Sequence, residues 1–210
     1  WWAKQAYGRQ LYIGQGIDRA LEPRSYAWKN KDERPDQIKY LRKYPQIQGS
    51  IFFSSSTFSS NPNGWDDSLR NNYYKYPAIP PPMPWIDSVK PEQPLLLYDS
   101  THSTLFSSSI DLYFREDKQN DLINRYVIYQ FNDLNDMDQN DPKNIKEIIL
   151  SGENFYHFIF QNIPPDQNKI IIAATALTRT NNESALSDFI YLDRNGNGWQ
   201  MISQPENANK

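Results

Sequence analysis

The chain has 210 residues, 38% hydrophobic and 22% charged, enough for one large or two ordinary folded domains. Its formal net charge is −3 and it has no dense Lys/Arg cluster, so nucleic acid or an anionic membrane surface is not expected as its main partner. Without cysteine and with two histidines, it lacks thiolate ligands and has too few imidazoles for a multi-histidine centre; we therefore expect no metal and no cofactor.

The beginning of the chain predicts a strand followed by a helix. It opens on WWAKQAYGRQ, without an initiator Met, and we expect the true start to lie upstream, so that this is a fragment or a processed piece. Residues 11–14 form a short apolar strand. The stretch DERPDQIKYLRKY at 32–44 predicts a helix, because Ile38 and Leu41 share one face and Pro35 suits its first turn.

A second strand and helix follow directly. Residues 49–53 are again apolar, and NGWDDSLRNNYYKY at 63–76 predicts a helix with Trp65, Leu69 and Tyr73 on one face. An order of strand, helix, strand, helix with apolar strands is typical of a parallel sheet covered by helices. Two such units are too few to close a barrel by themselves.

A proline-rich stretch, 76–94, divides the sequence and cannot form helix or central strand. Trp85 and Met83 within it favour a strap packed on a domain over a free linker. Beyond it we expect about seven strands in about a hundred residues, as in an immunoglobulin-like or fibronectin-type sandwich. The expected strands are 95–98, 104–114, 124–131, 145–150, 154–161, 170–179 and 185–192.

Three other stretches carry predictions. The acidic stretch 132–144 is expected to be a solvated, mobile loop. The motif DRNGNGW at 193–199 matches the opening of a calcium loop, but Asn-Gly between strands favours a hairpin. His157, on an alternating strand, is expected to be exposed or hydrogen-bonded there. Around 125–131 aromatic rings fall on both faces of one strand, so the sequence leaves open whether either face displays them.

The segments QLYIGQGIDR, QIKYLRKYPQIQGSIFFSSSTF and LRNNYYKYPAIPPPMPW together resemble the end of the catalytic region in glycosyl-hydrolase-like family 10. RYVIYQF and ATALTRTNNESALSD resemble the fibronectin-like domain that follows it. The resemblance implies an exported bacterial protein, in the periplasm or at the cell surface, often lipid-anchored. It implies that 1–75 are the last two units of a (β/α)8 barrel, 76–94 a strap or linker, and 95–210 a fibronectin type III-like sandwich.

In such barrels the site lies at the carboxyl ends of the strands, which implies a substrate cleft next to the two predicted strands. Gln15 and Ser54 follow them, and Trp28 lies in the loop after the first. The alternatives are that Gln15 caps a loop and that Ser54 satisfies backbone groups. Asp18 stands where the family often has an aromatic residue. It is either a substrate contact or an ion-pair partner of Arg19 or Arg24, and we expect the ion pair. The implied sugar-binding residues are Tyr12, Gln15, Ser54 and Trp28.

The two strand ends offer no carboxylate pair of the kind that glycoside hydrolysis requires. Asp66 and Asp67 fall in the first turn of a helix, where acids stabilise the helix dipole. The catalytic acids are therefore expected on upstream strands, and this piece alone is not expected to be active. The function implied is that of a glycoside hydrolase acting on a glycan; a non-catalytic carbohydrate-binding protein and a purely structural protein remain alternatives.

Overall fold

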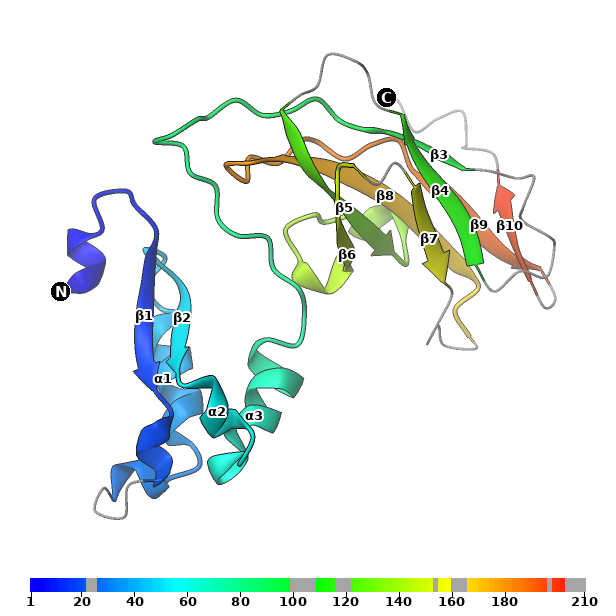
Figure 1. Ribbon diagram of the computed structural model, residues 1–210. Coiled ribbons are helices and arrows are strands. Elements are labelled where there is room, and N and C mark those ends of the chain that lie inside the picture. Colours follow the sequence, from blue (N-terminus) through cyan, green and yellow to red (C-terminus); the bar gives the residue numbers. More distant parts are fainter. Residues whose placement is uncertain are drawn as a thin grey trace. The chain divides into compact units, whose positions relative to one another are not determined.

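The computed structural model describes residues 1–21, 26–98, 109–115, 122–152, 155–159, 166–195 and 198–202. The chain forms two compact units, Trp1–Tyr76 and Pro77–Lys210 (Figure 1). In the described ranges we find no helix that is both long and apolar enough to span a membrane.

The first unit is built on two parallel strands, β1 (Leu11–Gly16) and β2 (Ile47–Phe53), joined by helix α1 (Glu33–Leu41). Their register pairs Tyr12 with Gly49 and Gly16 with Phe53, which confirms the predicted parallel pairing. The short helical turns of this unit are η1 (Trp2–Gln5), η2 (Asp18–Leu21), η3 (Ala27–Lys29), α2 (Ser55–Phe58), η4 (Pro62–Gly64), α3 (Trp65–Ser68) and η5 (Leu69–Tyr73).

The helix predicted over 63–76 is broken into pieces. Asn63 and Gly64 have positive φ angles, so regular helix begins only at Trp65. At the other end the amide of Tyr74 donates to the carbonyl of Leu69, and η5 is a π-helical turn. The predicted apolar face is retained in part, because Trp65 and Leu69 are both buried.

The two faces of the β1–β2 pair differ sharply. Residues paired across a parallel ladder point to the same side, so Ile13 and Gln15 share a face with Ser50 and Phe52. Helix α1 and the aromatic rings of Phe58 and Tyr74 cover that face. The opposite face, here called the open face, carries Tyr12, Ile51 and Phe53; Ile51 is 61% exposed and Phe53 68% exposed.

The second unit is a sandwich of two antiparallel sheets. One has the order β3-β4-β7 and the other β10-β9-β8-β5-β6. Leu112 and Phe158 from the first sheet pack with Ile128 and Ile172 from the second, so the main core lies between them. The strands are β3 (Leu95–Tyr98), β4 (Ser109–Arg115), β5 (Ile123–Phe131), β6 (Ile145–Leu150), β7 (Phe155–Ile159), β8 (Lys169–Thr178), β9 (Ile190–Asn195) and β10 (Gly198–Ile202).

The five-stranded sheet is buried on both faces. Tyr126 of β5 stacks on Phe114 inside the sandwich, with ring centroids 4.3 Å apart. On the outer side, Tyr129 and Phe131 stack on each other within a second apolar cluster that also includes Ile79 of the proline-rich stretch. The rings on both faces of β5 are therefore buried and form no exposed aromatic row.

The proline-rich stretch is fixed to the sandwich by polar contacts as well as by Ile79. The amide of Met83 donates to the carbonyl of Thr180 over 2.9 Å. The side chain of Asn182 donates to the carbonyl of Asp87 over 2.8 Å. Thr180, the acceptor, and Asn182, the donor, both lie in the turn after β8, so this turn anchors the proline-rich stretch.

The last predicted strand, 185–192, begins five residues later than expected. In 183–189 the hydroxyls of Ser184 and Ser187 accept from the amides of Ala176 and Ala174 of β8. Their own amides donate to the carbonyls of the same two residues. The segment 183–189 thus runs along β8, and serine hydroxyls accept from β8 amides where a strand would use backbone carbonyls. Regular strand starts only at Ile190.

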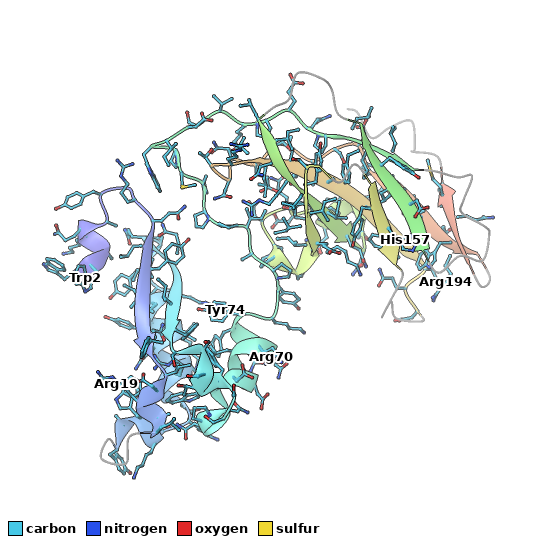
Figure 2. The ribbon with its side chains drawn as sticks, in the orientation of Figure 1. Trp2, Arg19, Arg70, Tyr74, His157 and Arg194 are labelled. Carbon is cyan, nitrogen blue, oxygen red and sulfur yellow. The ribbon has the colours of Figure 1, made fainter. Side chains whose placement is uncertain are left out.

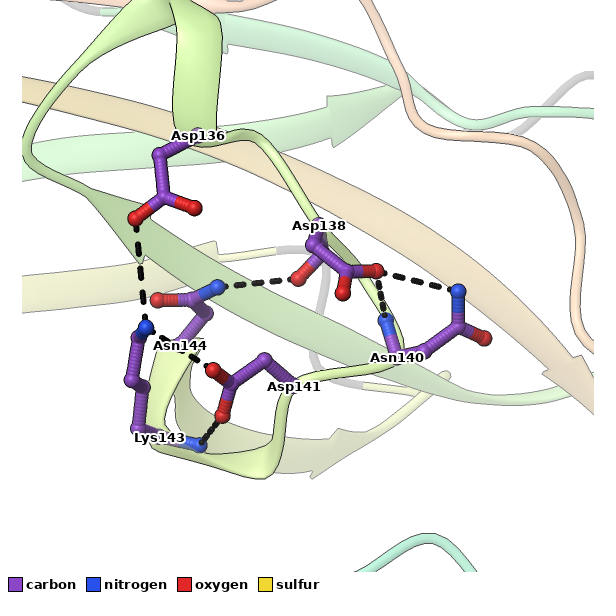
Figure 3. Close-up of polar contacts among 6 residues, drawn as sticks. All are labelled: Asp136, Asp138, Asn140, Asp141, Lys143 and Asn144. Carbon is purple, nitrogen blue, oxygen red and sulfur yellow. Dashed lines mark hydrogen bonds and ion pairs between the residues drawn. The ribbon is translucent and has the colours of Figure 1, made fainter.

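The stretch 132–144 is built from turns and is largely exposed, which agrees with the predicted solvated loop; its mobility stays a prediction. It contains η6 (Leu134–Asp136) and η7 (Pro142–Asn144), and Met137 packs on the outer cluster. Figure 3 shows how Asp138 and Asp141 accept from backbone amides two residues on, while the side chain of Asn144 donates to the carbonyl of Asp138. Such Asx turns satisfy the backbone locally and hold the segment in shape.

The hairpin prediction near the end of the chain agrees with the pairing of β9 and β10. The two strands are antiparallel and Asn195 lies opposite Gly198. The two residues between them lie outside the described ranges, and so does the end of the alternative calcium loop. His157 is exposed on β7 and its Nδ1 lies 2.7 Å from Asp111 Oδ1 on the neighbouring strand.

Replacing Ser187 tests the side-chain hydrogen bonds along β8. Ser187→Ala should lower the free energy of unfolding by about 1–3 kcal/mol, because the buried amide of Ala174 loses its acceptor. Ser88→Ala, at an exposed position of the same unit, should change it by less than about 0.5 kcal/mol. Urea denaturation measures both. Equal stability of the two variants would contradict this account of the segment.

The stability of the sandwich should fall as the pH rises above the ordinary pKa of tyrosine. Burial, together with the hydrogen bond to Glu183, raises the pKa of Tyr129 well above its usual value. Above about pH 10 the unfolded chain loses this phenol proton while the folded state keeps it, so unfolding becomes easier by at most about 1.4 kcal/mol per pH unit. Tyr129→Phe should flatten the decline and Tyr26→Phe, at an exposed position, should not. Denaturation at several alkaline pH values would show identical slopes if the argument is wrong.

Candidate functional site

The carboxyl ends of β1 and β2 meet at one edge of the first unit. Gly16 lies opposite Phe53, and the amide of Ile17 donates to the carbonyl of Phe53 over 2.8 Å. The peptide bond between Phe53 and Ser54 is cis. The segments that leave the two strands, with Asp18 on one side and Ser54 on the other, therefore start next to each other.

A buried arginine organises this edge from the covered side. Arg34, in the first turn of α1, is 0% exposed. Its guanidinium donates to the carbonyl of Gly16 over 2.8 Å and to Gln15 Oε1 over 2.7 Å. Its central carbon lies 5.1 Å from the ring centroid of Trp28 and 5.4 Å from that of Trp65. We refer to Arg34, Trp28 and Trp65 as the arginine cage.

Within the described ranges no carboxylate forms an ion pair with Arg34, the cation of the cage. Burial lowers the pKa of Arg34, and the negative charges of Glu33 and Asp18 partly oppose this effect. Arginine stays charged even when it is buried, so the faces of the two indole rings and the neutral oxygens stabilise the charge of Arg34. Nε of Arg34 has no hydrogen-bond partner. The cage therefore ties the end of β1 to the loop that carries Trp28.

Gln15 lies on the covered face, and its side chain is 5% exposed. Its oxygen accepts from Arg34, and its nitrogen donates to Ser50 Oγ over 2.7 Å. Both ends of the amide are thus occupied by neighbours within the unit. The amide of Gln15 therefore links helix α1 to strand β2 on the covered face of the sheet.

The other three predicted sugar-binding residues lie in different places. Trp28 is half-buried in the cage and meets Trp65 edge-to-face, with ring centroids 6.4 Å apart. Ser54 lies at the strand end, where its hydroxyl is 2.8 Å from that of Ser56. Tyr12 lies on the open face four residues before the end of β1, about 13 Å back along the strand. The structure therefore brings Gln15 and Trp28 together around Arg34 but leaves Tyr12 apart.

The acids near this edge differ in their partners. Asp66 accepts from Arg70, and Asp67 accepts from Asn61, so both are occupied in the first turn of α3. Asp18 is half-buried and forms no hydrogen bond or ion pair with the described part of the chain, so the expected pair with Arg19 is not formed. Arg24, the other expected partner, lies outside the described ranges.

Sequence reasoning missed Arg34 and the partners of Trp65. One signal for Arg34 was present, since a cation in the first turn of a helix faces the positive end of the helix dipole and needs another reason to be there. Trp65 donates its indole N–H to the carbonyl of Lys31 over 2.8 Å, a partner 34 residues away that no local pattern reveals.

Sequence likeness relates less than half of this chain to a known enzyme. No protein-family profile matches the chain. Over 98 residues, 46% of this chain, it is 35% identical to a Bacillus subtilis (strain 168) protein named glycosyl hydrolase YngK. That match spans 19% of the length of the Bacillus protein. The assignments to glycosyl-hydrolase-like family 10 and to a fibronectin-type domain thus stay predictions.

Two solved structures show partial similarity. A β-1,2-glucanase from Parabacteroides distasonis is 17% identical, with a TM-score of 0.36, over 55% of this chain and 13% of that one. A polysaccharide deacetylase from Bacillus cereus is 11% identical, with a TM-score of 0.34, over 49% of this chain and 30% of that one.

Removing the guanidinium should destabilise the first unit. Arg34→Ala should lower its free energy of unfolding by about 2–4 kcal/mol, because it opens a cavity beside two indoles and removes the donor to Gln15 Oε1 and to the Gly16 carbonyl. Lys29→Ala, at an exposed position of the same loop, should cost less than about 0.5 kcal/mol. Urea titration followed by tryptophan fluorescence measures both, and an Arg34→Ala loss below about 1 kcal/mol would contradict the role given to the cage.

Proposed function

We propose that this chain is part of a glycoside hydrolase that acts on a glycan. The observation that carries the proposal is the 35% identity over 98 residues to a glycosyl hydrolase. The parallel β1–β2 pair supports it, since helices cover one of its faces while the other is open and apolar. Strands with one face toward helices and the other toward a shared interior are the building units of a (β/α)8 barrel.

We propose further that upstream strands of the same protein complete this barrel. Isolated exposure of Ile51 and Phe53 is unfavourable in water, and neighbouring strands facing a common interior would cover them. The sandwich is then a fibronectin type III-like module, placed in an exported bacterial protein of the periplasm or cell surface. Membrane attachment, in this proposal, comes only through an upstream lipid anchor.

In the proposed site the predicted residues take different roles. Trp28 and Ser54 lie at the strand ends and would contact the sugar there. Gln15 would act through Arg34, because both ends of its amide are already hydrogen-bonded. Tyr12 would contact substrate only in the interior of the barrel. The catalytic acids are proposed to lie on the upstream strands.

A non-catalytic carbohydrate-binding protein is the alternative. Its strongest support would be an exposed row of rings on the sandwich. The rings of Tyr126, Tyr129 and Phe131 are buried, so β5 does not supply that row. The catalytic proposal is therefore favoured.

Hydrolysis by the complete gene product tests the proposal. That product should release reducing ends from at least one member of a panel of bacterial and plant polysaccharides, while the 210-residue chain should release none. The reason is that the two carboxylates needed for the reaction are proposed to lie outside this chain. Binding without hydrolysis by the complete product would favour the alternative, and activity of the 210-residue chain would refute the placing of the acids.

A further inference from the structure

Two charged side chains fold back over the last residue of β1. A Cβ atom added to Gly16 would lie 3.0 Å from Asp18 Oδ1 and 3.5 Å from Arg19 Nε. The φ angle of Gly16 is not positive, so its backbone does not demand glycine. On the same strand and face, a Cβ atom added to Gly14 would meet nothing within 4 Å. Glycine at position 16 thus makes room for the carboxylate of Asp18, whereas a Cβ would meet Arg19 at an ordinary van der Waals distance.

These side chains lie at the open face and not at the covered one. Gly16 is paired with Phe53, and paired residues of a parallel ladder point to the same side. Asp18 and Arg19, which approach Gly16 from its Cβ side, therefore lie on the face that also carries the exposed ring of Phe53. Figure 2 shows Arg19 beside the end of β1. Together these three side chains offer an acceptor, a donor and an apolar surface.

Asp18 has no partner of its own within the described ranges, although it is half-buried. The nearby positive charge of Arg34 interacts favourably with its carboxylate, but no hydrogen bond joins them. A partly buried acceptor that is left unpaired is unfavourable, since it gives up hydrogen bonds to water without replacing them. A ligand that donates hydrogen bonds would remove this cost.

We propose that Asp18, Arg19 and Phe53 form a binding subsite for a neutral sugar ring. A carboxylate only accepts, so Asp18 would take the hydrogens of two adjacent hydroxyls, and the guanidinium of Arg19 would donate to a hydroxyl or ring oxygen. The C–H face of the same ring packs on Phe53. The subsite rests on the proposed glycan function but does not require that the chain carry the catalytic acids.

Matched variants test the subsite by binding alone. Cellohexaose, laminarihexaose and chitohexaose are titrated into the 210-residue chain, and amide chemical shifts give the dissociation constant. Asp18→Asn should weaken binding about tenfold, because it removes a charged acceptor. Asp36→Asn makes the same change of charge at an exposed ion pair on α1 and should stay within about twofold.

A second pair of variants changes no charge. Gly16→Ala should also weaken binding, because the new methyl group displaces the carboxylate of Asp18, whereas Gly14→Ala should bind like the wild type. Binding that Asp18→Asn and Gly16→Ala leave unchanged would overturn the subsite and leave the proposed function standing. A wild-type chain that binds none of the three oligosaccharides would overturn the subsite, while hydrolysis by the complete gene product would still decide the proposed function.

Discussion

The first unit depends on one buried cation. Arg34 lies beside two indole rings and donates to the end of β1, so a single side chain connects the first strand, the loop after it and the helix. Burying a guanidinium is costly, because its charge leaves water and must be stabilised by its neighbours. Here two indole rings lie on adjoining sides of it, and three neutral oxygens accept its hydrogen bonds: those of Gln15, Gln37 and Gly16.

At the strand ends, the two faces of the β1–β2 pair therefore differ in whether their polar side chains are already hydrogen-bonded. On the covered side of the β1–β2 pair, the side chains of Gln15 and Ser50 are hydrogen-bonded within the unit. The groups that remain available are on the other side, where Asp18, Arg19 and Phe53 gather around a glycine. A binding site on parallel strands requires a hydrogen-bonded covered face and polar groups available on the open face.

The sequence predicted the elements well wherever local pattern decides them. Parallel pairing of β1 and β2 and most strands of the sandwich follow from apolar runs bounded by turn residues. Three features could not be predicted, because distant partners set them. Arg34 donates a hydrogen bond to the amide of Gln15. Serine side chains in 183–189 bond to β8 where a regular strand was predicted. Aspartate side chains in 132–144 accept from nearby backbone amides. The sequence placed Gln15 at the end of a strand but could not show that Arg34 would donate to its amide oxygen.

The serine hydrogen bonds along β8 also bear on association between chains. Beyond Ile172, β8 has no regular strand on the β9 side, and an uncovered strand there would be a template for a neighbouring molecule. Ser184 and Ser187 occupy its amides with hydroxyls, and their segment does not continue the regular ladder. In the half of β8 that β9 leaves unpaired, the amides of Ala174 and Ala176 are thus already occupied, so they are not available to a strand of a neighbouring molecule.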